Sequence, residues 1–157
     1  MRIKVPGIVK RIYPDMVWSI DDPEGLYLTF DDGPTPGVTE WILSTLDRYD
    51  AKATFFVLGK NVELYPDLYR MILGRGHKVG NHTYSHQKGW GMSLRRYIED
   101  VDLAADMVHS ELFRPPYANI TINQFCAVAQ RYKVVMWSIL TRDYNRAVSP
   151  KSCLRGA

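Results

Sequence analysis

The sequence predicts an α/β domain built on a mainly parallel sheet. Short apolar runs rich in aromatic and β-branched residues alternate along the chain with amphipathic stretches of helical period. This alternation is typical of a parallel sheet, or of an open barrel with helices outside, because parallel strands need helical crossovers. The 157 residues suit one hydrophobic core, and we expect a single domain over residues 1–157.

Five strands are expected, and turn residues mark where they end. The first strand stops at Asp31-Asp32-Gly33-Pro34, and the fourth stops at Pro115-Pro116. The fifth contains the apolar run from Val134 to Trp137. The predicted strands cover residues 26–30, 53–58, 77–81, 111–113 and 133–139.

Helices are predicted between the strands from apolar residues at helical spacing. Ser93 and Thr121 are suitable N-caps for the third and fourth helices. Pro66 lies inside the second helix, although proline is best tolerated in a first turn, so the start of that helix is left open. The predicted helices cover residues 38–49, 62–73, 94–108 and 122–131.

Composition and charge exclude several classes of protein. The formal net charge is only +3 and the basic residues are spread along the chain, which argues against nucleic-acid binding. No apolar run approaches the roughly 18 residues of a membrane span. The two cysteines form no close pair and are expected to be free thiols. The N-terminus lacks the continuous apolar run of a signal peptide, because Pro6, Lys10, Arg11 and Pro14 interrupt it. A cytoplasmic location is therefore expected.

Polar clusters follow four of the predicted strands. Asp31-Asp32, the His82 and His86 pair, Arg114-Pro115-Pro116-Tyr117 and Asp143 each come after a strand. Ligands of α/β folds bind at the carboxyl ends of the strands, where these groups would converge. The sequence therefore predicts one polar site on that face.

A metal site is one interpretation of the aspartates and histidines. Asp-Asp-Gly-Pro is also a good turn sequence, and two histidines four residues apart are weak evidence alone. On one helical turn, however, His82 and His86 would project from the same side. Two imidazoles and one carboxylate form a catalytic zinc set with a position left for water. Thr83 and Ser85 are candidate hydrogen-bonding partners around that set.

The remaining candidates have structural interpretations beside the functional one. His77 and His109 are expected to be structural or solvated. The two prolines after Arg114 make a stiff loop that could point a backbone N–H at an oxyanion, or simply end a strand. Arg114 could form a salt bridge that orients a carboxylate.

Together these segments resemble the polysaccharide deacetylase family, the NodB-like carbohydrate esterases of family four. Residues 29–34 match the family sequence TFDDGP, residues 82–86 match H[S/T]xxH, and residues 114–117 match RxPY. The resemblance covers about residues 26–144 and implies an irregular (β/α) barrel. It also implies a hydrolase that removes acetyl groups, chiefly N-acetyl, from an amino-sugar glycan such as peptidoglycan or chitin.

The resemblance also implies roles for the site residues. Asp32, His82 and His86 would hold a divalent metal, with zinc as the default, and Asp31 would be the general base. The backbone N–H of Tyr117 would hold the oxyanion. Arg114 and Asp143 would complete the catalytic set.

Three departures from the family pattern leave alternatives open. The family motif DxxDW corresponds here to residues 140–144, in which only Asp143 remains, and Ala118 replaces a usual glycine. No histidine follows His109, so the leucine-x-histidine motif that supplies the family's general acid is expected to be missing. We therefore expect metal binding but feeble amide hydrolysis. The alternatives are a related hydrolase of cyclic imides or ureides and a metal-binding pseudoenzyme.

Overall fold

A computed structural model describes residues 7–156, which group into two compact units. The larger unit runs from Asp22 to Val134. The smaller unit combines the chain up to Asp21 with the chain from Val135 onward, and its helices are α1 (Gly7–Ile12) and α7 (Pro150–Gly156). None of the described helices has the length and hydropathy to span a bilayer.

The larger unit is organised around a five-stranded parallel sheet with strand order β1-β2-β3-β4-β5. Asp31 lies opposite Phe56 at the end of the first strand pair, and Asn81 lies opposite both Val57 and Phe113. This sheet confirms the predicted α/β class. Its strands are β1 (Leu28–Asp31), β2 (Ala53–Val57), β3 (Lys78–Asn81), β4 (Leu112–Phe113) and β5 (Lys133–Val134).

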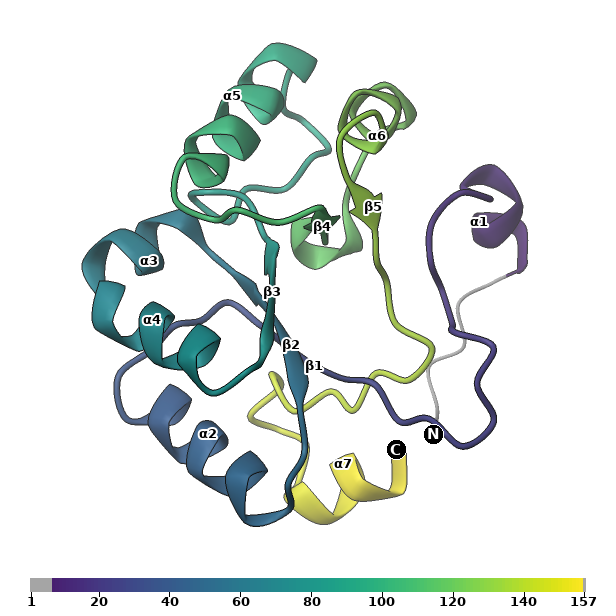
Figure 1. Cartoon of the computed structure of the whole chain (residues 1–157). Coiled ribbons are helices and arrows are strands. Elements are labelled where there is room, and N and C mark those ends of the chain that lie inside the picture. The colour runs from purple at the N-terminus through teal and green to yellow at the C-terminus, as the bar shows by residue number, and fades with distance from the viewer. Residues whose placement is uncertain (1–6, 157) are drawn as a thin grey trace. The chain divides into compact units, whose positions relative to one another are not determined.

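Helices connect consecutive strands, as is usual for crossovers between parallel strands. In Figure 1, α2, α3 and α4 lie on the same side of β1, β2 and β3. A cluster of buried apolar residues, among them Leu43, Phe55 and Ile72, joins these helices to the sheet. The helices of this unit are α2 (Val38–Arg48), α3 (Gly59–Leu64), α4 (Pro66–Gly74), α5 (Leu94–Ala105) and α6 (Ile122–Ala129).

The single helix predicted for residues 62–73 is wrong. Two helices, α3 and α4, replace it, and Pro66 is the first residue of the second. Proline has no backbone N–H and excludes the residue before it from the helical region. Tyr65 accordingly adopts φ −131° and ψ 58°, which separates the two helices. Pro66 thus occupies the first position of α4, which is the helical position that proline favours.

The predicted caps are present. The Ser93 hydroxyl accepts a hydrogen bond from the backbone N–H of Arg96. Thr121 and Gln124 form a reciprocal capping box at the start of α6. These bonds satisfy backbone donors that the helices leave unpaired.

The fifth strand is much shorter than the predicted span 133–139. It ends at Val134, and Val135 instead forms an isolated parallel bridge with Val17. The backbone N–H of Met136 donates to the carbonyl oxygen of Val17 at 2.8 Å. The apolar run after β5 therefore pairs with a segment from the start of the chain, a long-range contact that local periodicity does not encode.

Candidate metal centre

Three parallel strands end at residues of the predicted site. Asp31 is the last residue of β1 and Asp32 follows it. His82 comes directly after β3, and Arg114 comes directly after β4. Because parallel strands present their carboxyl ends at one edge of a sheet, these side chains meet there, as the sequence predicts.

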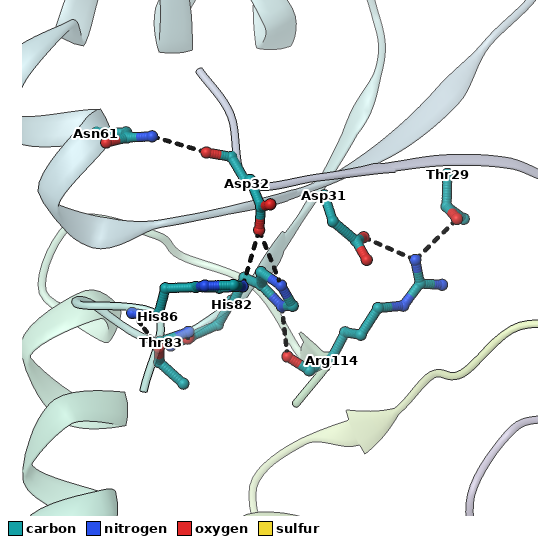
Figure 2. A network of polar contacts seen from close by, with 9 residues as sticks. Thr29, Asp31, Asp32, Asn61, His82, Thr83, His86 and Arg114 are labelled. Carbon is teal, nitrogen blue, oxygen red and sulfur yellow. Dashed lines mark hydrogen bonds and ion pairs between the residues drawn. The ribbon is translucent and has the colours of Figure 1, made fainter. Parts of the chain in front are cut away.

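Asp32, His82 and His86 form a compact group of possible metal ligands (Figure 2). Oδ1 of Asp32 lies 3.0 Å from Nε2 of His86 and 3.4 Å from Nε2 of His82. The three ligand atoms all lie within 4.8 Å of one another. The His82 side chain is buried, whereas 60% of the Asp32 side chain is exposed, so the group is open to solvent on one side.

An irregular turn, and not the helical turn considered from the sequence, brings His82 and His86 together. Asp32, Thr83 and His86 have φ values of 73°, 66° and 62°, which lie in the left-handed region. Asn81 Oδ1 accepts from the Thr83 N–H at 2.8 Å, and Thr83 Oγ1 accepts from the His86 N–H at 3.1 Å. The Asn61 amide donates to the Asp32 carbonyl oxygen at 2.7 Å. Side-chain hydrogen bonds thus hold the strained backbone of the ligand residues.

The His82 ring is oriented by a backbone carbonyl. Nδ1 of His82 lies 2.6 Å from the carbonyl oxygen of Arg114, so a neutral ring must carry its hydrogen on Nδ1. Nε2 then presents a lone pair toward the carboxylate of Asp32. A cation between these two groups is favourable: the Nε2 proton when the ring is charged, and a divalent metal ion when the ring is neutral.

The carboxylate of Asp32 is in the form that a metal needs. Hydrogen bonding with His82, and then with His86, holds the pKa of Asp32 well below its usual value, while partial burial opposes this shift. Asp32 is therefore ionised at neutral pH.

Asp31 points away from the ligand group and toward a buried arginine (Figure 2). The Arg114 guanidinium donates to Oδ1 of Asp31 and to Oγ1 of Thr29, both at 2.8 Å. It lies 4.1 Å from the ring centroid of Phe56. Burial lowers the pKa of Arg114, and its contact with Asp31 acts in the opposite direction. The salt bridge considered from the sequence is present, and it fixes the orientation of Asp31.

Tyr117 lies beside the ligand group in a 3₁₀ turn, η1 (Pro116–Ala118). Its φ of 57° and ψ of 14° place it in the left-handed region. The Tyr117 ring centroid is 4.5 Å from that of His86, and the side chain is largely exposed. The stiff Pro115-Pro116 segment therefore positions Tyr117 beside His86.

Asp143 belongs to the smaller unit, where its Oδ1 accepts a hydrogen bond from Thr141 Oγ1 at 2.6 Å. Its catalytic role stays a prediction. His77 is buried, and its Nδ1 accepts from the Ala53 N–H at 3.3 Å, in keeping with the structural role expected for it. His109 is exposed.

Sequence reasoning missed several residues that support the site. Asn61 and Asn81 bond the backbone around the ligands from a helix and a strand end. Asp100 in α5 accepts from both the hydroxyl and the N–H of Ser85. Ser85 therefore forms hydrogen bonds with Asp100 of α5, whereas Thr83 accepts one from the backbone N–H of His86. The position of Asn81 next to His82 could have indicated a supporting role. Nothing in the sequence around Asn61 or Asp100 links them to the site.

Comparison with known proteins agrees with this geometry. The sequence model of the polysaccharide deacetylase family matches residues 20–137. A peptidoglycan-N-acetylglucosamine deacetylase of Bacillus cereus is 37% identical over 125 residues, which cover 75% of this chain and 46% of that protein. Chitin deacetylase 1 of Saccharomyces cerevisiae is 37% identical over 125 residues, which cover 74% of this chain and 40% of that protein.

A solved structure shares the fold over almost the whole chain. It is a peptidoglycan N-acetylglucosamine deacetylase in complex with a naphthalenyl N-hydroxybenzamide, with a TM-score of 0.87 and 30% sequence identity. The match covers 98% of this chain and 74% of that chain. This chain spans less than half the length of the two curated relatives described above. Because the family model matches most of the sequence and the strand-end motifs meet at one site, this chain belongs to the polysaccharide deacetylase family.

Proposed function

We propose that this protein is a metal-dependent hydrolase that removes N-acetyl groups from an amino-sugar glycan. The observation that carries the proposal is the group of Asp32, His82 and His86 beside a second carboxylate, Asp31, that Arg114 holds apart from them. A binding module would need no such separate, oriented carboxylate. The similar proteins named above are deacetylases of peptidoglycan and of chitin, which supports both the reaction and the substrate class.

Zinc is the metal that we propose for this group. Two imidazoles and one carboxylate are a usual protein ligand set for catalytic zinc, and the exposed side of Asp32 leaves room for further ligands. A divalent ion held there would supply Lewis-acid chemistry, polarising an acetyl carbonyl and lowering the pKa of a water molecule. The Arg114 carbonyl contributes by keeping Nε2 of His82 free to ligate.

The residues around this group have separate roles in the proposed reaction. Asp31 accepts the proton of the attacking water, and because Arg114 engages Oδ1, Oδ2 can take it. Asp31 then returns this proton to the amide nitrogen as the bond between that nitrogen and the acetyl carbon breaks. The Tyr117 N–H donates to the oxygen that becomes negative as the acetyl carbon turns tetrahedral. Asp143 is proposed as a further catalytic residue on the family resemblance alone.

Acetate release tests the proposal directly. The zinc-loaded protein should release acetate from N-acetyl chito-oligosaccharides or from peptidoglycan fragments, and a chelator should stop the release until zinc is restored. Asp31→Asn is the matched control, because it keeps the side-chain shape and removes the base. Failure of the metal-loaded protein to release acetate from either glycan would contradict the proposal.

A further inference from the structure

A groove adjoins the ligand group on the side of His86. Its volume is about 440 Å³, and its lining includes His86, Lys88, Trp90 and Tyr117. A second cavity of about 500 Å³, lined by Gly91, Met92, Ser93 and Arg96, shares Gly91 and Met92 with the first. A surface therefore extends from His86 along the loop that leads to α5.

Trp90 is an exposed aromatic residue that the fold holds firmly. Its side chain is 68% exposed, yet its indole N–H donates to the Ile120 carbonyl oxygen at 3.2 Å. Its backbone N–H donates to Oδ1 of Asn119. An exposed indole normally loses conformational freedom when it binds a ligand, but here that freedom is already restricted. The indole of Trp90 is thus an exposed, preorganised aromatic surface beside the site.

A buried glutamine anchors the loop that carries Trp90. Gln124, which is 1% exposed, donates from Nε2 to the carbonyl oxygens of Gly89 and Met92 at 2.9 and 3.0 Å. A Cβ at Gly89 would lie only 2.5 Å from both the Asn119 carbonyl oxygen and Oε1 of Gln124. The loop is therefore tied to α6 on both sides of Trp90, and this tight contact leaves no room for a larger residue at position 89.

The groove is also cationic. Nζ of Lys88 lies 5.0 Å from the centroid of the Tyr117 ring, which itself contacts His86. Arg96 lines the second cavity. No carboxylate is among the described residues that line either cavity. The side-chain charges of this surface therefore favour an anionic ligand, and the Tyr117 ring holds one of them near the metal ligands.

We propose that this groove binds the sugar next to the one that is deacetylated, and that it selects a carboxylated amino-sugar glycan over a neutral one. Trp90 stacks on the apolar face of the pyranose ring, and Lys88 pairs with the carboxylate. N-acetylmuramic acid without its stem peptide carries a free lactyl carboxylate of this kind, whereas chitin has none. This assignment rests on the proposed deacetylation of a glycan and deepens it by naming the substrate class.

Equilibrium binding to two matched tetrasaccharides tests the role of Lys88. Both alternate N-acetylglucosamine with N-acetylmuramic acid, and they differ only in a free lactyl carboxylate or its primary amide. The zinc-loaded protein should bind the acid about two- to five-fold more tightly, as expected for an exposed ion pair. Lys88→Gln should abolish this preference, and so should roughly 1 M salt. Lys133→Gln, which removes an exposed charge at the start of β5, should retain it.

The same ligands test Trp90. Trp90→Ala should weaken binding of both tetrasaccharides by about tenfold, and Trp90→Phe should restore most of the loss. Tyr49→Ala, which truncates an exposed aromatic residue at the end of α2, is the matched control.

Each outcome decides for or against the assignment. Equal affinity of the wild type for acid and amide, or no affinity for either, would overturn the selection of a carboxylate. Unchanged binding by Trp90→Ala would overturn the stacking role. Acetate release measured on the same ligands separates the two proposals: binding with the predicted preference but without acetate release contradicts deacetylation and leaves only the selection of a carboxylated glycan by Lys88 and Trp90 standing.

Discussion

Nδ1 of His82, which follows β3, lies 2.6 Å from the carbonyl oxygen of Arg114, which follows β4. The same Arg114 donates through its guanidinium to Asp31 at the end of β1. One residue thus orients a proposed metal ligand with its backbone and the proposed base with its side chain. The two functions meet in Arg114, although they belong to different strands.

Replacement of His82 should cost metal affinity. His82→Ala removes one of three protein ligands, so we expect zinc affinity to fall by at least about 100-fold, more than the loss of a supporting residue costs. Competition with a chromogenic chelator measures the affinity. His109→Ala, at an exposed histidine outside the group, is the control and should bind zinc normally. Equal zinc content in His82→Ala and the wild type would refute the ligand assignment.

Asp31 and Asp32 should not be interchangeable. Asp31→Asn should keep the metal but slow acetate release by about 10² to 10⁴-fold, because an amide cannot accept the proton. Asp32→Asn should weaken metal binding, because it removes the charge that both histidines face. Metal content and turnover are measured on the same samples. Loss of zinc from both variants alike would show that the division of roles is wrong.

Arg114 should contribute to stability as well as to catalysis. Arg114→Gln removes a buried guanidinium that donates to Thr29 and to the partly exposed Asp31, so the free energy of unfolding should fall by about 1–3 kcal/mol. Urea unfolding of the metal-free proteins measures this loss. Arg95→Gln disrupts an exposed pair with Glu99 and should change the free energy of unfolding much less than Arg114→Gln does. Equal effects of the two substitutions would contradict the importance of the buried pair.

His77 should make stability depend on pH. Burial lowers the pKa of His77, and Lys52 lowers it further, so the unfolded chain binds this proton more readily than the folded chain. Stability should therefore be lost as the pH falls below about 6.5, the ordinary pKa of histidine, with a slope of at most about 1.4 kcal/mol per pH unit. His77→Gln should lose less stability than the wild type between pH 7 and pH 5.

The difference between the two proteins isolates His77, since the other histidines contribute equally to both. Urea unfolding of metal-free samples at several pH values provides the measurement. Parallel stability curves for the wild type and His77→Gln would show that His77 binds protons equally well in the folded and unfolded chains.

The sequence predicted that Asp32, His82 and Arg114 meet because this prediction required only the positions of strand ends, whereas the place of Asp143 stays a prediction. Apolar runs locate the ends of β1, β3 and β4, and parallel pairing brings Asp32, His82 and Arg114 to one edge. The α/β class follows from the same alternation. Pro66 indicated that a helix start lies near it, but the sequence did not predict that a separate helix, α3, precedes it.

Other features depend on contacts that are distant in the sequence. Asn61 bonds the Asp32 carbonyl across 29 positions, and Gln124 bonds Gly89 across 35. The pairing of Val135 with Val17 shortens β5 in the same way. Neither periodicity nor turn chemistry carries information about such partners. The groove beside Trp90 was equally hidden, because Tyr117 lines it and Gln124 anchors its loop from segments distant in the sequence.

The left-handed backbone at Asp32, Thr83 and His86 has a consequence for protein engineering. Each such residue costs on the order of 1 kcal/mol, which the surrounding fold must offset. Grafting an aspartate and two histidines onto another scaffold at the same sequence spacing would not reproduce this centre. A successful graft must include the turn itself, together with Asn61 and Asn81, whose side chains hydrogen-bond its backbone.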